Sequence, residues 1–219
     1  MFKINLEECC TNADFYSVLK PFYQLRATEA GCDEAGRGCY AGPVFAAAVI
    51  LPRDFSHPVL NDSKQLTAEQ RAELRIVVEQ NALAYSVAMV DNDEIDQTNI
   101  LRASFKAMHL ALDGLKKKKP KLLLIDGNRF TPYRDVKHHC IIKGDGIYSS
   151  IAAASILAKT YRDEYMQKLH EEFPHYNWKN NKGYGTEEHR NAIDSHGLCK
   201  YHRKSFNIMS SPMELFGEE

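Results

Sequence analysis

The chain has 219 residues, of which 44% are hydrophobic, and a formal net charge of −1 at pH 7, which suits a soluble globular protein with one full core. No stretch reaches the roughly eighteen continuous apolar residues of a membrane span, and the N-terminus lacks a signal-peptide pattern, so we expect a cytoplasmic protein with no membrane association. The six cysteines have neither a zinc spacing nor a Cys-x-x-Cys pair, which predicts reduced thiols.

Two predicted strands surround a glycine-rich motif near the start of the chain. Residues 1–22 are consistent with a loosely helical lead-in segment, to which we assign no chemistry. Residues 24–30 predict an extended run, and residues 43–51 form a continuous apolar stretch typical of a buried strand. The segment 31–43, Gly-Cys-Asp-Glu-Ala-Gly-Arg-Gly-Cys-Tyr-Ala-Gly-Pro, lies between them.

This motif places two adjacent carboxylates before a glycine turn. Neighbouring strand side chains face opposite ways, so Asp33 and Glu34 share a ligand only if the strand ends between them, and we expect Gly36 and Gly38 to supply that ending. The glycines also let backbone N–H groups approach a ligand closely. A partly buried acid pair is costly without a cation, so we interpret the motif as part of a divalent-metal site. A hairpin turn with solvated acids is the alternative.

Residues 61–64 precede a helix whose start is marked by the capping-box pair Thr67 and Gln70. From that loop Lys64 could contact a phosphate, or it could be an ordinary surface lysine.

Residues 83–90 alternate as a strand does. Residue 91 then begins a long predicted helix whose apolar residues recur every three or four positions and face the core, namely Leu101, Phe105, Met108, Leu112 and Leu115.

Two apolar strands are each followed by an acid. Residues 121–125 lead into Asp126, and residues 138–142 lead towards Asp145. Ligands of open α/β sheets bind at the carboxyl ends of strands, so both acids are candidate ligands. Asp145 could instead cap the N-terminus of the helix predicted from Ile147.

The helix predicted over residues 147–172 presents Ser155 and Lys159 one turn apart on one face. From residue 173 the chain becomes polar and aromatic, which predicts a loop and then a small helical lobe. There Tyr184 lies between two glycines, which suits stacking on a base or sugar. The alternative is that the ring only packs between the lobe and the core. Thr186 is placed to cap the following helix.

Lysine and arginine exceed the acids in residues 116–145 and again in residues 179–205. Such patches can follow a phosphate backbone even in a neutral chain. The run 116–119, taken alone, is equally consistent with a solvated helix end.

Four acids are therefore expected near strand ends or helix starts, and no nucleophilic triad or phosphate-binding loop motif competes with them. Hard oxygen ligands select Mg²⁺ or Mn²⁺, and two such ions about 4 Å apart make a phosphoryl-transfer site. This pattern predicts a metal-dependent nuclease that uses Asp33, Glu34, Asp126 and Asp145.

The motifs together resemble bacterial ribonuclease HII, a family of type 2 ribonucleases H. The matching segments are residues 31–38, 41–43, 61–64, 125–127, 143–145, 153–159, 183–186 with His189, and 202–206. Tyr40 is bulkier than the resemblance leads us to expect. The implied fold is α/β, a ribonuclease H-like mixed sheet flanked by helices, with a catalytic domain over 1–172 and a C-terminal substrate-binding lobe and tail over 173–219.

The resemblance also implies roles. The four acids would be the catalytic ligands of two Mg²⁺ or Mn²⁺ ions. The backbone of Gly36, Arg37 and Gly38 would read a 2′-hydroxyl, and Tyr184 would stack at the RNA–DNA junction. The remaining substrate-binding candidates are Lys64, Ser155 and Lys159.

The implied reaction is hydrolysis of the phosphodiester 5′ of a ribonucleotide, in RNA/DNA hybrids or in a DNA duplex with one embedded ribonucleotide, which leaves 5′-phosphate and 3′-hydroxyl ends and serves DNA repair. A junction resolvase of the same fold and a non-catalytic hybrid-binding module are the alternatives. We expect a monomer. The tail around residues 213–216 faintly resembles a sliding-clamp peptide but lacks the usual glutamine, and an ordinary frayed terminus is the stronger explanation.

Overall fold

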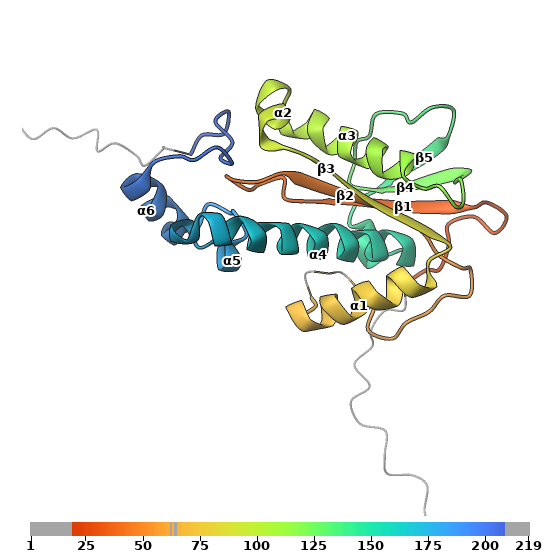
Figure 1. Cartoon of the computed structure of the whole chain (residues 1–219). Coiled ribbons are helices and arrows are strands. Elements are labelled where there is room, and N and C mark those ends of the chain that lie inside the picture. Colours follow the sequence, from red (N-terminus) through yellow and green to blue (C-terminus); the bar gives the residue numbers. More distant parts are fainter. Residues whose placement is uncertain (1–18, 62, 64, 209–219) are drawn as a thin grey trace, which may run out of the picture.

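The computed structural model describes residues 19–61, 63 and 65–208 (Figure 1). Most of the predicted lead-in segment, Lys64 and the tail from residue 209 lie outside the described residues. The strands are β1 (Glu29–Ala35), β2 (Val44–Ile50), β3 (Ala84–Val90), β4 (Leu122–Asp126) and β5 (Lys137–Ile141). The helices are α1 (Ala68–Asn81), α2 (Asn92–Gln97), α3 (Ile100–Asp113), α4 (Ser149–Glu172), α5 (Trp178–Asn181) and α6 (Glu187–His196), with 3₁₀ turns η1 (Gly144–Gly146) and η2 (Pro174–Tyr176).

The strands form one mixed sheet in the order β3-β2-β1-β4-β5. β2 is antiparallel to β1 and β3, whereas β4 is parallel to β1 and β5. The parallel pairing brings the carboxyl ends of β1 and β4 to the same edge of the sheet. The predicted mixed sheet flanked by helices is thus confirmed.

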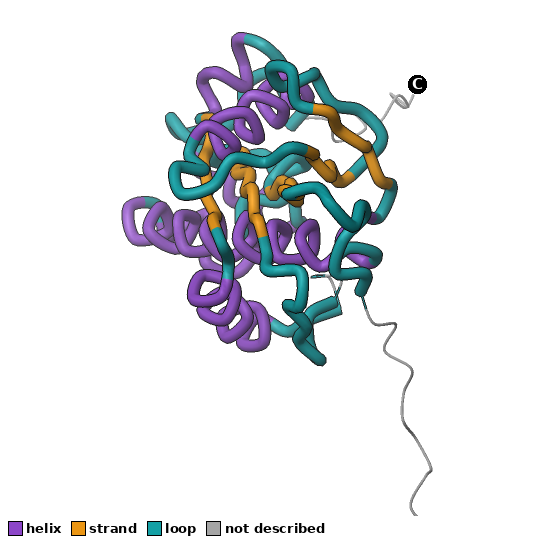
Figure 2. Tube along the Cα trace, turned by 90° about the vertical axis from the view of Figure 1, so that its right-hand side faces the viewer, coloured by secondary structure: helices purple, strands orange, loops and turns teal. Residues whose placement is uncertain are grey.

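Helices cover both faces of the sheet, as Figures 1 and 2 show. α3 packs on one face and α4 on the other, with α1 beside α4. In β2, Ala46 and Ala48 join the apolar cluster on the α3 side, while Ala47 and Val49 join the one on the α4 side. A strand covered on both faces is apolar at every position, which explains the continuous apolar run in its sequence.

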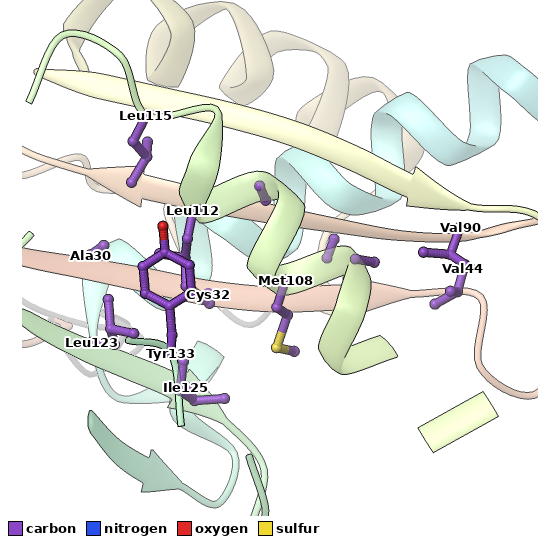
Figure 3. Packing of buried hydrophobic residues seen from close by; sticks show 14 of the residues in the cluster. Ala30, Cys32, Val44, Val90, Met108, Leu112, Leu115, Leu123, Ile125 and Tyr133 are labelled. Atoms are coloured by element: carbon purple, nitrogen blue, oxygen red, sulfur yellow. The ribbon is translucent and has the colours of Figure 1, made fainter. Parts of the chain in front are cut away.

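The cluster on the α3 side is the largest part of the core (Figure 3). Met108 and Leu112 of α3 belong to it together with Cys32 of β1 and Ile125 of β4. On the opposite face α4 begins so close to β1 that a Cβ atom at Gly31 would come within 2.2 Å of the backbone of α4. The small side chains at this contact therefore set the distance between helix and sheet.

Local capping signals proved reliable. Thr67 and Gln70 form the predicted capping box at the start of α1. Thr186 accepts a hydrogen bond from the His189 N–H at the start of α6, and Gly197 follows its last residue with a positive φ of 75°.

Three boundaries differ from the sequence predictions. β1 begins at Glu29 rather than at residue 24, and α4 begins at Ser149 rather than at residue 147. The predicted long helix is two helices, because Asn99 leaves the helical conformation and its side chain accepts a hydrogen bond from the Arg102 N–H at 2.9 Å. A short polar side chain that bonds the backbone in this way competes with continued helix.

The segment after α4 (residues 173–208, here called the lobe) shares its apolar cluster with α4 and with the glycine-rich motif. Tyr176, Trp178 and Ile193 pack with Met166 of α4 and with Ala41, which follows the glycine-rich turn. The lobe therefore lies directly against the motif at residues 31–43. No helix in the described part of the chain is long and apolar enough to cross a membrane.

Candidate active site

Asp33 and Asp126 occupy equivalent positions at one edge of the sheet. The parallel register pairs Cys32 with Ile125, so the next residue of each strand is an acid. Asp33 is only 4% exposed. Burial first, and then the charges of Glu34 and Asp126, raise the pKa of Asp33 well above its usual value. Concentrated negative charge at this edge therefore favours binding of a cation.

Glu34 lies within the same strand, so the prediction that the strand ends between Asp33 and Glu34 is wrong. β1 stays paired with β2 up to Ala35, whereas its pairing with β4 stops at Cys32. The β4 side of the strand is thus already open where the acids lie. An Arg37 Nη1–Glu34 Oε1 ion pair of 3.1 Å holds Glu34. Burial raises the pKa of Glu34, and the Arg37 charge opposes that rise.

The other two acids meet at the turn after β5. The Gly144 N–H donates to Asp126 Oδ1 at 2.7 Å, which joins the end of β4 to η1. Asp145 lies inside η1 and is 2% exposed. α4 begins after Tyr148, so Asp145 is not its N-cap, and that alternative is wrong. The turn instead keeps Asp145 buried at the edge where β4 ends.

The four carboxylates fit a divalent cation through their charge and donor type. Within the described residues, no three His, Cys, Asp or Glu side chains are grouped closely enough to ligate one ion as they stand. Arg37 holds Glu34, and the Gly144 N–H holds Asp126. Carboxylate oxygens, including those of the buried Asp33 and Asp145, nevertheless match the hard-ligand preference of Mg²⁺ and Mn²⁺.

Lys159 lies beside the acids from the α4 side. Its Nζ donates to the Ser155 hydroxyl at 2.8 Å and also to Ser63, and the two hydroxyls are 2.9 Å apart. The Lys159 charge lowers the pKa values of Asp33 and Glu34, against the larger effect of burial. The predicted candidates Ser155 and Lys159 thus belong to one cluster next to the carboxylates.

Arg203, which sequence reasoning gave no role, anchors the glycine-rich loop. Its guanidinium donates to the carbonyl oxygens of Gly36, Arg37 and Gly42 at 2.7, 2.8 and 3.0 Å. The side chain is fully buried. Its position within the matched segment 202–206 was the only sequence signal for it.

A second buried arginine, Arg162 of α4, anchors the far side of the loop. It donates to the carbonyl oxygens of Pro43, Lys182 and Ala41 at 3.1, 2.8 and 3.2 Å. No sequence signal marked this residue, because α4 shows only a generic helical pattern around it.

Gly36 and Gly38 play different structural parts. Gly36 has a φ of 95°, and a Cβ atom there would come within 2.1 Å of Arg162 Nε. Gly38 is exposed, and no heavy atom lies within 4 Å of the position that its Cβ would take. Gly36 is thus required by the fold, whereas the small size of Gly38 leaves open surface beside the loop.

Tyr184 is 48% exposed and lies beside the glycine-rich loop. Cys39 and Tyr184 form an isolated antiparallel bridge, and the Tyr40 N–H donates to the Gly183 carbonyl at 2.7 Å. A Cβ atom at Gly185 would come within 2.3 Å of the Tyr40 ring. The bulk of Tyr40, unexpected from the resemblance, is therefore accommodated by the absence of a side chain at Gly185.

Two buried histidines support the Tyr184 turn. Trp178 Nε1–H donates to His189 Nε2 at 3.0 Å, so the other ring nitrogen, Nδ1, carries the proton and donates to the Tyr184 carbonyl at 2.9 Å. The Cys199 N–H donates to His202 Nδ1 at 3.0 Å, so His202 Nε2–H donates to His189 Nε2 at 3.2 Å. Both rings are thus neutral. Sequence reasoning assigned neither histidine a role.

A cavity lies beside the acids on the α3 side. Its walls include Glu34, Arg37 and Asp126 on one side and Leu101 and Phe105 of α3 on the other. Both apolar residues are only partly buried, so the prediction that they belong to the core is wrong. α3 packs mainly over β2 and β3 and also contacts β1, and Leu101 and Phe105 face the cavity.

Comparisons with known proteins agree with this arrangement. The sequence pattern of the family "Ribonuclease HII" matches residues 30–209. The chain is 61% identical over 192 residues to ribonuclease HII of Bacteroides thetaiotaomicron (88% of this chain, 96% of the relative) and 59% identical over 194 residues to that of Christiangramia forsetii (89% and 98%).

Solved structures show the same fold. Ribonuclease H2 from Pyrococcus horikoshii superimposes with a TM-score of 0.67 at 26% identity, covering 82% of this chain and 94% of that one. The ribonuclease HII in a PCNA complex from Archaeoglobus fulgidus gives a TM-score of 0.68 at 24% identity, covering 86% and 100%. Bst-RNase HIII, solved with Mn²⁺, gives 0.63 at 19% identity, covering 88% and 69%.

The mixed sheet, with acids at the ends of its parallel strands, defines a ribonuclease H-like enzyme, a metal-dependent hydrolase that acts on nucleic acid. The chain belongs to the ribonuclease HII family. The resemblance read from the sequence motifs is therefore confirmed, as is the endonuclease class.

Proposed function

We propose that this enzyme hydrolyses the phosphodiester 5′ of a ribonucleotide in RNA/DNA hybrids and in DNA duplexes with a single embedded ribonucleotide, leaving 5′-phosphate and 3′-hydroxyl ends. The observation that carries the proposal is the position of Asp33 and Asp126 at one sheet edge, next to an exposed glycine loop. The acids account for metal-dependent hydrolysis, and the family match identifies the enzyme as a nuclease. The adjoining loop supplies a means of selecting ribose.

The metal site of this proposal consists of the four carboxylates at the sheet edge, Asp33, Glu34, Asp126 and Asp145. When bound, two Mg²⁺ or Mn²⁺ ions supply activation of water and stabilisation of the leaving 3′-oxygen. The Mn²⁺ complex of Bst-RNase HIII supports divalent ions of this type. Arg37 releases Glu34 in this proposal, because a cation competes for the same carboxylate.

Selection of ribose is assigned to Gly36, Arg37 and Gly38. Only RNA offers a 2′-hydroxyl, and a wide minor groove exposes it to a protein backbone. The open space at Gly38 permits this approach. The loop therefore reads the sugar, while the acids act on the adjacent phosphate.

The remaining contacts hold the duplex. Lys159, bonded to Ser155, presents positive charge beside the acids and suits a phosphate near the cleavage site. Lys64, which lies outside the described residues, is assigned to another phosphate of the substrate. The half-exposed ring of Tyr184 stacks on the nucleotide 3′ of the ribonucleotide and so recognises the RNA–DNA junction.

The biological setting proposed is ribonucleotide excision during DNA repair in the cytoplasm, by a monomer. The division at residue 172 into a catalytic domain and a substrate-binding lobe is part of this proposal. The archaeal relative in complex with PCNA supports a weak sliding-clamp contact, which we assign to the tail around residues 213–216.

The deciding experiment incubates the enzyme with a labelled DNA duplex that contains one ribonucleotide, with and without Mg²⁺. We expect a single nick 5′ of the ribonucleotide with Mg²⁺, and neither a nick in EDTA nor cleavage of the all-DNA duplex. Equal cleavage of a four-way junction without ribonucleotides would favour the resolvase. Hybrid binding in EDTA without cleavage in Mg²⁺ would favour the binding module.

A further inference from the structure

Arg203 stands out because a buried cation normally has an acidic partner. It is fully buried and forms no ion pair with a carboxylate in the described part of the chain. All three of its hydrogen bonds go to backbone carbonyls of the loop over residues 36–42. Burial lowers the Arg203 pKa to about 10, so the guanidinium remains charged at neutral pH.

The two shortest of these bonds determine the direction of two peptide units. Arg203 holds the carbonyl oxygens of Gly36 and Arg37 inward at 2.7 and 2.8 Å. In a planar trans peptide the N–H points away from the C=O of the same unit, and none of the described peptide bonds is cis. The N–H groups of Arg37 and Gly38 therefore point outward from the guanidinium.

These two amides are available to a ligand. Arg37 and Gly38 are both exposed, and neither N–H donates to any group in the described part of the chain. A cation bonded to the carbonyl of a peptide unit also draws electron density from it, which makes the N–H a stronger donor. The loop thus presents two adjacent, polarised donors on open surface.

We propose that Arg203 is the positioning residue that aims and polarises the amides of Arg37 and Gly38 at the 2′-hydroxyl oxygen, so that a buried guanidinium sets ribose selectivity without touching the substrate. The inference rests on the proposed function, because it presumes that this loop reads ribose. An oxygen with two lone pairs can accept hydrogen bonds from two adjacent donors. A planar guanidinium suits this task, since its fork spans two carbonyls at once and a lysine ammonium does not.

Arg162 provides a matched control. It is almost as deeply buried and also donates to three carbonyls, but these belong to Ala41, Pro43 and Lys182, and it contacts Gly36 by packing and not by a hydrogen bond to either reading unit. Arg162→Lys and Arg203→Lys each keep the positive charge but replace the planar guanidinium, which bonds several carbonyls at once, with an ammonium group. A merely structural role predicts similar effects of both, whereas our inference separates them.

The test measures Kd in EDTA, where hydrolysis does not proceed, for a duplex with one ribonucleotide and for the same duplex in DNA alone. The readout is the selectivity ratio, which is the Kd for the all-DNA duplex divided by the Kd for the ribonucleotide duplex. The melting temperature of each variant is measured alongside it. We expect Arg203→Lys to reduce the ratio by about tenfold, since two hydrogen bonds lose their aim, and Arg162→Lys to keep it within about twofold. Equal ratios in the two variants at equal loss of melting temperature would overturn the inference.

A measurement on the unaltered protein covers the case in which Arg203→Lys does not fold. In ¹H–¹⁵N spectra the ribonucleotide duplex should shift the Arg37 and Gly38 amides downfield more than the all-DNA duplex does. The Gly42 amide, already bonded to the Tyr201 carbonyl at 2.9 Å, serves as the internal reference. Unchanged Arg37 and Gly38 signals would overturn the inference. If the two Kd values of the unaltered protein are nearly equal, the loop does not distinguish ribose from deoxyribose, and that part of the proposed function is wrong instead.

Discussion

Gly36 lies against the Arg162 side chain so closely that a Cβ atom would come within 2.1 Å of Nε. Its φ of 95° is also one that other residues rarely adopt. Gly36→Ala should therefore destabilise the protein by about 1–3 kcal/mol from backbone strain, and further from the clash. Urea unfolding measures this loss, and an unchanged free energy of unfolding would contradict the described loop.

Gly38→Val tests the other glycine of the same motif. Its Cβ would enter open space, so the melting temperature should change little. The branched side chain should nevertheless block the approach of the substrate, and kcat/KM on a single-ribonucleotide duplex should fall by about tenfold or more. A loss of activity that a lowered melting temperature fully explains would favour an ordinary structural turn.

Asp33→Asn and Asp126→Asn should lower kcat/KM by about a thousandfold or more while leaving duplex binding largely intact. Because burial and its neighbours raise the Asp33 pKa, Asp33→Asn should leave the metal-free melting temperature unchanged or higher. Asp135→Asn, at an exposed loop residue, is the matched control. Near-normal turnover by either active-site variant would exclude the four-carboxylate site.

Tyr184→Ala should lose about ten- to a hundredfold in kcat/KM on a single embedded ribonucleotide, because base–aromatic stacking is worth about 1–3 kcal/mol. The loss should be smaller on a long RNA/DNA hybrid, where no junction need be engaged. Tyr184→Phe keeps the ring and should stay near the unaltered enzyme. Equal losses on both substrates would show that Tyr184 only anchors the lobe.

The buried histidine pair predicts a loss of stability in acid. Burial, and then the neighbouring His189, lower the His202 pKa to about 4. An unfolded histidine titrates near 6.5, so the stability from neutral His202 is complete above pH 6.5 and is lost as pH falls from about 6.5 to 4, by up to about 3 kcal/mol. His202→Asn, whose side-chain oxygen can replace Nδ1 as acceptor, should flatten this part of the curve. Urea unfolding at a series of pH values measures the free energy of unfolding for both proteins. The same pH dependence in both would contradict the prediction.

Local patterns predicted much of this molecule because their causes are local. The capping box of Thr67 and Gln70 acts within one helical turn, and the apolar run before Asp126 reflects burial of β4. The break at Asn99 escaped prediction because the apolar residues that define the period, Leu101 to Leu115, all follow it. A hydrophobic pattern records which side of a helix is buried, and it does not record a one-residue change in backbone direction.

Long-range contacts explain what the sequence did not show. β1 continues past Asp33 because its two sides lose their partners at different residues, which depends on two other strands. Leu101 and Phe105 carry a core-like pattern yet line a cavity, because the opposite wall is formed by Glu34 of β1 and Asp126 of β4, which only the sheet pairing brings there. Arg162 reaches the glycine loop across more than a hundred positions, and no spacing in the sequence signals such a bond.

The contact between Arg203 and Gly36 joins residues 167 positions apart in the chain. Synthesis proceeds from the N-terminus, so all four acids leave the ribosome well before Arg203 does. A nascent chain therefore carries its hydrolytic carboxylates before it carries the anchor of the loop beside them. If Arg203 sets ribose selectivity as proposed, the order of translation makes that selectivity one of the last properties that the enzyme acquires, and a message broken shortly before codon 203 encodes the acids without that anchor.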